Sequence, residues 1–143
     1  MESALPESVP FHVLLAEDDR ELRELLSSVL RREGFAVTAL EDGAKLLDYC
    51  ADHLGSDGSI RGVDLLVTDV RMPGFSGLDV LTALRRVSVR CPVVLVTAFG
   101  DEALHQFARQ LGVVAVLDKP FDVNELTYFA SVQRTLSGGA PES

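Results

Sequence analysis

The sequence predicts an α/β fold in which a parallel sheet is covered by helices on both faces. Five short, almost wholly apolar segments alternate with stretches that repeat apolar residues every three or four positions. Apolar strands without polar alternation are typical of parallel sheets, because both faces of such sheets are buried. Strict alternation of strand and helix is the pattern of βα units. With no longer repeat visible, we expect one doubly wound domain.

The composition fits a single globular domain and limits its partners. A chain of 143 residues with 47% hydrophobic residues can bury a core without disulfides. A formal net charge of −9 disfavours direct contact with nucleic acid, whose phosphates would be repelled. No apolar run reaches the length of a membrane span, so we expect no membrane contact and a cytoplasmic location. Cys50 and Cys91 are interpreted as buried thiols in a reducing compartment rather than a disulfide.

The first two strand–helix units are predicted before residue 55. Residues 11–16 form a strand that an acidic run ends, and residues 20–33 form an amphipathic helix closed by Gly34. Its apolar face carries Leu22, Leu25, Leu26, Val29 and Leu30. Residues 35–39 form the second strand. Asp42 caps a second helix that carries Ala44, Leu47, Cys50 and Ala51. Three glycines in residues 55–62 then predict an exposed loop.

Three further units complete the sheet. Residues 64–69 form a strand that Met72-Pro73-Gly74 ends, and a helix starts near Ser76. Residues 92–97 and 113–117 are the last two strands. Between them, residues 102–111 form a helix with apolar Ala103, Leu104, Phe107, Ala108 and Leu111. The last helix begins near Asp122, with Leu126, Phe129 and Ala130 facing inward.

Polar side chains follow four of the predicted strands. Glu17 and Asp18 come after the first strand, and Asp69 ends the third. Thr97 ends the fourth strand, and Lys119 lies just beyond the fifth. Each has an ordinary interpretation alone, since an acidic run can cap a helix and a lysine can be plain surface. Because the carboxyl ends of parallel strands share one edge of a sheet, their joint placement predicts a site there.

The residue types at this edge suit phosphoryl chemistry. Crowded carboxylates repel one another unless a cation lies among them, and oxygen ligands with open positions suit Mg²⁺. Mg²⁺ would also neutralise the oxygens of an incoming phosphoryl group. Asp69 could then act as a nucleophile and become an aspartyl-phosphate, with Lys119 supplying a positive charge and Thr97 a hydroxyl donor.

These residues stand in a recognisable series of motifs. Glu17-Asp18, the run Asp69-x-x-Met72-Pro73-x-x-x-Gly77, Val96-Thr97-Ala98 and Lys119-Pro120-Phe121 occur in that order. Over residues 11–136 the chain resembles the receiver domains of two-component response regulators. The resemblance implies a (βα)5 flavodoxin-like sheet of strand order 2-1-3-4-5. Residues 1–10 are then a flexible extension, and residues 137–143 a flexible tail or the start of a linker.

The resemblance also implies a role for each residue at the edge. Asp69 would be the phospho-acceptor, with Thr97 as the switch hydroxyl and Lys119 as the phosphate partner. Asp18 and Asp69 would bind Mg²⁺ directly and Glu17 through water, with the main-chain carbonyl of Arg71 as a further ligand. The Lys119–Pro120 peptide bond is expected to be cis, as in the family.

Partners follow from the same resemblance. A histidine kinase or a histidine phosphotransfer protein would donate the phosphoryl group to Asp69. The chain would then act on an output partner, an effector domain or a second copy of itself in a phosphorylation-dependent homodimer. The expected output face carries His105, Arg109, Val116, Tyr128 and Gln133. Such a chain is not an enzyme in the usual sense, because it only takes up its own phosphoryl group and slowly loses it.

Two features depart from the family or could tune it. The switch aromatic of the family falls on Val116, so the usual inward rotation of an aromatic ring cannot operate. Arg71 and Phe99 lie two residues beyond Asp69 and Thr97, and we expect Phe99 to shield the acyl-phosphate from water.

Two alternative functions stay open. One is a receiver-like interaction module that works without phosphate, which Val116 slightly favours. The other is a Mg²⁺-dependent aspartyl phosphatase or phosphotransferase of the haloacid-dehalogenase kind. Such enzymes need a second acid two residues after the nucleophile, where this chain has Arg71.

Overall fold

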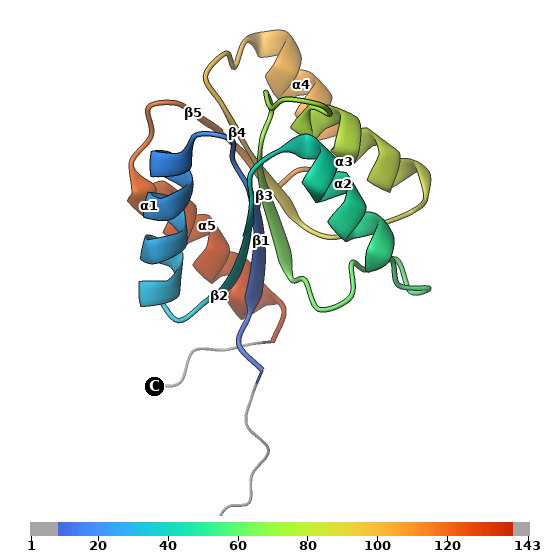
Figure 1. Ribbon diagram of the computed structural model, residues 1–143, viewed down its shortest axis with the longest axis horizontal. Helices are drawn as coiled ribbons and strands as arrows, with labels where there is room; N and C mark the ends of the chain where they lie inside the picture. Colours follow the sequence, from blue (N-terminus) through green and yellow to red (C-terminus); the bar gives the residue numbers. More distant parts are fainter. Residues whose placement is uncertain (1–8, 139–143) are drawn as a thin grey trace, which may run out of the picture.

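The computed structural model describes residues 9–138 and contains the predicted alternation of strand and helix in that range (Figure 1). The predictions for residues 1–8 and 139–143 lie outside the described residues. The elements are β1 (His12–Ala16), α1 (Arg20–Arg32), β2 (Ala36–Leu40), α2 (Gly43–Asp52), β3 (Leu65–Asp69), α3 (Gly77–Arg86), β4 (Val93–Thr97), α4 (Glu102–Gln110), β5 (Ala115–Asp118) and α5 (Val123–Leu136).

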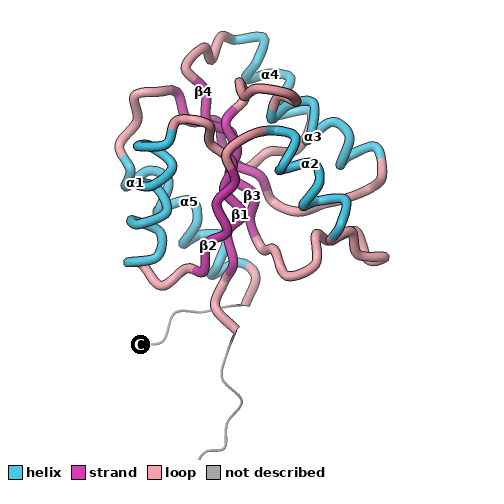
Figure 2. Tube along the Cα trace, in the orientation of Figure 1, coloured by secondary structure: helices cyan, strands magenta, loops and turns pink. Residues whose placement is uncertain are grey.

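The strands form one parallel sheet in the order β2-β1-β3-β4-β5, which confirms the predicted fold class. Figure 2 shows the strands gathered between two groups of helices. Helices α1 and α5 cover one face, and α2, α3 and α4 cover the other (Figure 1). Successive residues of each strand therefore enter two different cores: Leu66 of β3 packs with α2 and α3, and Leu65 packs with α1 and α5. Every residue of β3 and β4 is buried, as the apolar runs predict.

An acidic or hydroxyl side chain caps each helix. Asp19, Asp42, Ser76, Asp101 and Asp122 each accept a hydrogen bond from a backbone N–H of the helix that follows. Ser76 also takes part in a capping box with Asp79. Asp19 is therefore committed to α1, although it belongs to the same acidic run as Glu17 and Asp18.

The loop of residues 55–62 is only partly as predicted. Ile60 is fully buried in the core, so the loop is not simply exposed. An antiparallel bridge pairs Leu54 with Ile60, and the Asp57 carboxylate accepts hydrogen bonds from Ser59 between them. The polar turn satisfies its own backbone, which allows the one large apolar residue of the loop to pack inward.

Three helices differ from the predicted packing. In α1, Leu25 of the predicted apolar face is 49% exposed. In α4 only Ala108 is buried, and the Phe107 side chain stays 42% exposed. In α2 the buried residues include Leu46, whereas Ala44 and Ala51 face solvent. Each of these helices carries an apolar residue that its contact with the sheet leaves exposed. Strand β5 is also displaced, running from Ala115 to Asp118 instead of over residues 113–117.

Arg85 joins the end of α3 to the end of α4. Its Nε donates to the Leu111 carbonyl at 2.8 Å, and its Nη1 donates to the Val89 carbonyl at 2.8 Å. Both Nη atoms also reach the Cys91 carbonyl. One guanidinium therefore closes the carboxyl end of α4 against the loop that leads into β4.

The two cysteines are buried and free, as predicted. Burial raises the pKa of the Cys50 thiol to about 11 and that of Cys91 to about 12, so both stay protonated. In the part of the chain that the structure describes, every helix is too short or too polar to cross a membrane.

Candidate functional site

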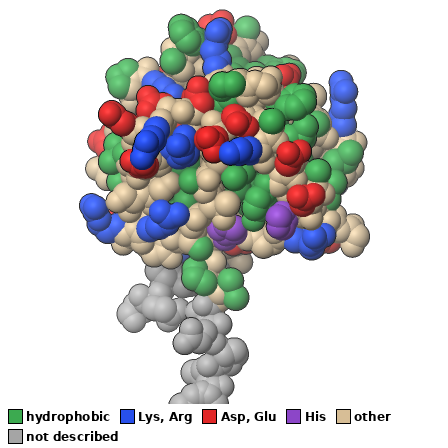
Figure 3. All heavy atoms as spheres, in the orientation of Figure 1, with side chains coloured by type: hydrophobic (Ala, Val, Ile, Leu, Met, Phe, Trp, Pro, Cys, Tyr) green, Lys and Arg blue, Asp and Glu red, His purple; other side chains and the backbone are tan. Residues whose placement is uncertain are grey.

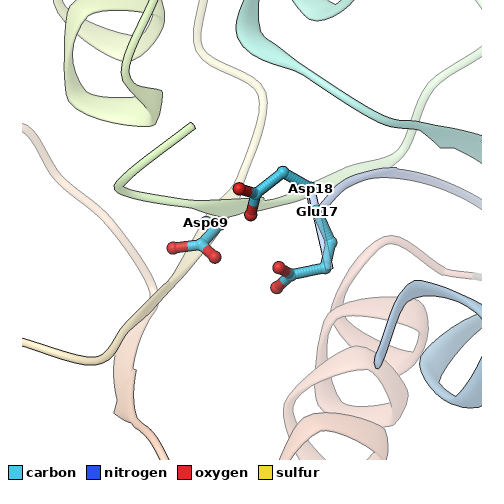
Figure 4. Close-up of side chains that lie close together, drawn as sticks. All are labelled: Glu17, Asp18 and Asp69. Atoms are coloured by element: carbon cyan, nitrogen blue, oxygen red, sulfur yellow. The ribbon is translucent and has the colours of Figure 1, made fainter. Parts of the chain in front are cut away.

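Three carboxylates meet at the carboxyl edge of the sheet. Asp69 is the last residue of β3, and Glu17 and Asp18 follow β1, its neighbour in the sheet (Figure 4). One carboxylate oxygen from each lies within 4.8 Å of the others. Glu17 and Asp69 are buried, whereas Asp18 is exposed. The sequence prediction that these residues converge is therefore confirmed in geometry.

Lys119, which follows β5 at the same carboxyl edge, completes this group. Its ammonium lies 2.7 Å from Oδ2 of Asp69 and 3.2 Å from Oε1 of Glu17. The Lys119–Pro120 bond is cis, as expected. Burial lowers the pKa of Lys119, but the hydrogen bond and charge of Asp69, with help from Glu17, outweigh this and leave that pKa raised. Lys119 is thus a permanent positive charge between two buried carboxylates.

Thr97 stands at the same edge, buried at the end of β4. Its hydroxyl accepts the backbone N–H of Phe99 at 3.0 Å, and its carbonyl accepts the backbone N–H of Lys119 at 2.7 Å. The threonine therefore joins the start of the β4–α4 loop to the backbone that carries the lysine.

Glu17 is a buried carboxylate that its neighbours only partly satisfy. Burial and the nearby charge of Asp69 together raise the pKa of its carboxyl to about 7, although the Asp19 N–H and the charge of Lys119 act to lower it. Its Oε1 has no properly oriented hydrogen-bond donor among the described residues, although Lys119 lies near it. Lys119 thus pairs with two of the three acids, and a site made only of oxygen ligands fits a small divalent cation such as Mg²⁺. The residues present fit the metal that the sequence predicts.

The backbone around the acids is held in place by close contacts. A Cβ on Gly77 would lie 2.2 Å from the Asp69 carbonyl oxygen, so only glycine lets α3 begin directly on the end of β3. The N–H of Arg71 donates to Oδ1 of Asp69 at 3.2 Å. On the other side, Nη1 of Arg23 donates to the Glu17 carbonyl at 2.8 Å. Arg23 was not singled out in the sequence, because a lone arginine on a helix gives no signal.

Arg71 and Phe99 meet across the mouth of the site. The Arg71 guanidinium lies over the Phe99 ring, 4.5 Å from its centre, in a cation–π contact. This contact joins the loop after β3 to the loop after β4. The Phe99 ring is otherwise largely exposed.

A second pair near Lys119 was missed in the sequence. Asp118 comes just before the lysine, and its Oδ2 lies 3.1 Å from Nε2 of His105 on α4. The two residues are thirteen positions apart, and nothing in the sequence marks them as partners. Only the placement of α4 over the sheet edge brings them together.

Comparison with known proteins agrees with this arrangement. The profile of the response regulator receiver domain matches residues 13–130. The chain is 40% identical over 114 residues to the transcriptional regulatory protein CpxR of Escherichia coli, covering 80% of this chain and 45% of that protein. It is 37% identical over 142 residues to the transcriptional regulatory protein FixJ of Azorhizobium caulinodans, covering 96% of this chain and 60% of FixJ. The chain thus spans about half the length of these relatives.

A solved structure supports the fold. The receiver domain of Francisella response regulator 1452 superposes with a TM-score of 0.78 at 23% identity, covering 90% of this chain and 99% of that one. At this identity the likeness concerns the fold alone. The family assignment comes from the sequence match, which covers most of the chain and includes the acidic edge described above. The chain therefore belongs to the response regulator receiver domains of two-component systems.

Proposed function

We propose that this chain is a signalling switch that is set by a phosphoryl group on Asp69. An oxygen of Asp69 attacks the phosphorus of a phosphohistidine on a histidine kinase or a histidine phosphotransfer protein. The P–N bond breaks, and the imidazole nitrogen keeps the electron pair and takes up a proton. The observation that carries this proposal is the buried Asp69 carboxylate held 2.7 Å from Lys119 beside two further acids.

In this proposal the surrounding residues neutralise charge. Asp18 and Asp69, Glu17 through water and the Arg71 carbonyl would hold Mg²⁺, which would supply positive charge to the phosphoryl oxygens. Lys119 pairs with one phosphoryl oxygen, and Thr97 donates its hydroxyl to another. Phosphorylation adds about −1.5 to −2 charges at pH 7, so both contacts strengthen once the group is transferred.

The surface beside Lys119 offers a place for the donor. A hollow of about 390 Å³ lies between α1 and the β5–α5 loop. It is lined by Lys119, by the acids Asp19 and Glu21, and by the apolar residues Leu22, Leu25, Pro120, Phe121 and Val123. Leu25 is 49% exposed there, which is unusual for the apolar face of a helix. We propose that the donor docks in this hollow, beside Lys119, whose ammonium lies 2.7 Å from Asp69.

The output passes through α4, β5 and α5 to a partner, an effector domain or a second copy of the chain. The names of the CpxR and FixJ relatives favour the control of transcription as the output. On the face that Figure 3 shows, basic side chains are interspersed with acidic ones, which supports the proposal that this domain does not itself contact nucleic acid. Residues 11–136 are proposed as the receiver, which catalyses only its own phosphorylation and dephosphorylation.

Phosphorylation by a small-molecule donor tests the proposal. Protein with Mg²⁺ and acetyl phosphate is expected to form an acid-stable, base-labile adduct that mass spectrometry maps to Asp69. Asp69→Asn and omission of Mg²⁺ should each abolish it. A wild-type protein that forms no adduct and still binds a partner would instead favour an interaction module that works without phosphate. Rapid, continuous hydrolysis of the donor would favour a phosphatase.

A further inference from the structure

The route from Asp69 to α4 has a gap where the family usually has an aromatic side chain. Val116 occupies that place and is half-buried against the core. A branched three-carbon side chain has no ring to turn inward or outward. If the state of Asp69 reaches α4 in this chain, another contact between β5 and α4 has to carry it.

Asp118 makes such a contact two residues further along β5. It pairs in register with Thr97, and the next residue is Lys119. Its carboxylate oxygens lie 3.3 and 3.1 Å from Nε2 of His105, in the first turns of α4. Among the residues that the structure describes, no other pair of side chains is hydrogen-bonded between β5 and α4.

The same carboxylate packs against the β4–α4 loop. A Cβ on Gly100 would lie 1.8 Å from Oδ1 of Asp118 and 3.0 Å from the methyl group of Thr97. The loop therefore lies directly on the carboxylate, and glycine leaves the room for it. Asp118 touches the loop that begins at Thr97 and, through His105, the helix that this loop leads into.

We propose that Asp118 and His105 form a latch that holds α4 against β5 and that phosphorylation of Asp69 releases. The inference rests on the proposed function. In the unphosphorylated chain the Thr97 hydroxyl accepts the Phe99 N–H and fixes the start of the loop. When that hydroxyl turns to a phosphoryl oxygen on Asp69, the Phe99 N–H is freed and Gly100 moves relative to Asp118. The carboxylate then loses its place beside His105. Both residues are positioning residues, because neither touches the phosphoryl group.

Amide NMR spectra of the unphosphorylated chain test the latch. His105→Ala should move the amide signals of α4 part of the way along the direction that beryllofluoride with Mg²⁺ produces in the wild type. Losing one partly exposed hydrogen bond should raise the population of molecules in which α4 is released from β5 by about three- to tenfold. Phosphorylation by acetyl phosphate should become faster by a similar factor. His105→Gln keeps a donor for Asp118 and should restore the wild-type spectrum.

Matched variants separate the latch from a general weakening of α4. Gln106→Ala removes a hydrogen bond to Glu102 within the same helix and should leave both readouts unchanged. Gly100→Ala should displace the Asp118 carboxylate and reproduce His105→Ala, and the double variant should add nothing further. In a chain that already carries Asp118→Ala, adding Gly100→Ala should not move the α4 signals any further.

The outcomes distinguish the latch from the proposed function. Unmoved α4 signals in His105→Ala, or additive effects of Gly100→Ala and His105→Ala, overturn the latch. The latch also fails if beryllofluoride shifts the signals around Asp69 in the wild type while leaving those of His105 and Asp118 in place. If beryllofluoride shifts no signal around Asp69, the proposed function falls and phosphorylation-driven release falls with it.

Discussion

The two edges of the sheet use polar side chains in opposite ways. At the amino edge, the ring of His12 contacts the Gly62 carbonyl and lies 2.8 Å from the Thr38 hydroxyl, and the His12 N–H donates to Asp64. Arg61 likewise donates to two main-chain carbonyls at the end of α2. At the carboxyl edge, Glu17 and Asp69 instead share one lysine. The contacts at the amino edge hold the chain in place, because most of them involve the main chain. At the carboxyl edge the two acids have only one lysine between them, so a positively charged ligand can bind there.

The largest expected effect is the loss of phosphorylation when Asp69, at the carboxyl edge, is replaced. Asp69→Asn should form no adduct with acetyl phosphate and Mg²⁺, because an amide cannot act as the nucleophile. The matched change at the amino edge, Asp64→Asn, should leave the amount and rate of adduct as in the wild type. Mass spectrometry of both variants checks this, and an equal loss in Asp64→Asn would abolish the functional distinction between the edges.

Metal binding should depend on an exposed acid of the carboxyl edge. Asp18→Asn should weaken Mg²⁺ binding by about 100-fold, because one charged oxygen ligand is lost. Since Asp18 is exposed, its replacement should change the melting temperature of the metal-free protein little. Calorimetric titration with Mg²⁺ measures the affinity, and unchanged binding would remove Asp18 from the proposed ligand set.

Glu17 should make the metal-free protein less stable at higher pH. Its pKa is raised from 4.5 to about 7 in the folded protein, so folding favours the protonated carboxyl. The resulting stabilisation is complete below about pH 4.5 and is lost as the pH rises through about 7. Without metal, Glu17→Gln should therefore raise the free energy of unfolding at pH 8 by about 3 kcal/mol.

Denaturant unfolding with chelator at pH 4.5 and pH 8 gives this measurement. The wild type and Glu17→Gln should differ much more at pH 8 than at pH 4.5. An equal difference at both values would show that burial of the Glu17 charge is not the cause. Saturating Mg²⁺ should stabilise the wild type more than the variant.

The amino edge should affect stability and not phosphorylation. His12→Ala should lower the free energy of unfolding by about 1–2 kcal/mol, because its two ring contacts are lost. The rate of adduct formation on Asp69 should stay as in the wild type under conditions where both proteins are folded. A slower rate in the folded variant would connect the two edges and weaken the comparison.

The smallest expected effect concerns how long the carboxyl edge keeps its phosphoryl group. Phe99→Ala removes the ring that stacks on Arg71 at the mouth of the site, so water should reach the acyl-phosphate more easily. Loss of the adduct should become about two- to fivefold faster, in line with the strength of an exposed cation–π contact. Arg71→Ala should act in the same direction. Phe107→Ala, an exposed phenylalanine on α4, is the control, and equal lifetimes in all variants would exclude shielding.

The sequence allowed the sheet, the Asp42 cap and the convergent acids to be predicted, because each depends on short-range patterns. Strand ends can be read from where an apolar run stops, and parallel order then brings Asp69, Thr97 and Lys119 to one edge. The pairing of His105 with Asp118 depends on which turn of α4 lies over β5, and periodicity does not set that angle. Ile60 was missed for a related reason, since burial of one residue in a polar loop depends on the space left by other elements.

The guanidinium of Arg85 gives α4 the mechanics of a lever. It ties the carboxyl end of the helix at Leu111, while the opposite end is held by the loop after Thr97. Nine residues give α4 a length of about 13 Å. A swing of about 10° around the tied end would displace the first turn by about 2 Å and the last turn hardly at all. A partner that contacts the first turn of α4 would therefore meet the largest displacement between the two states of this chain.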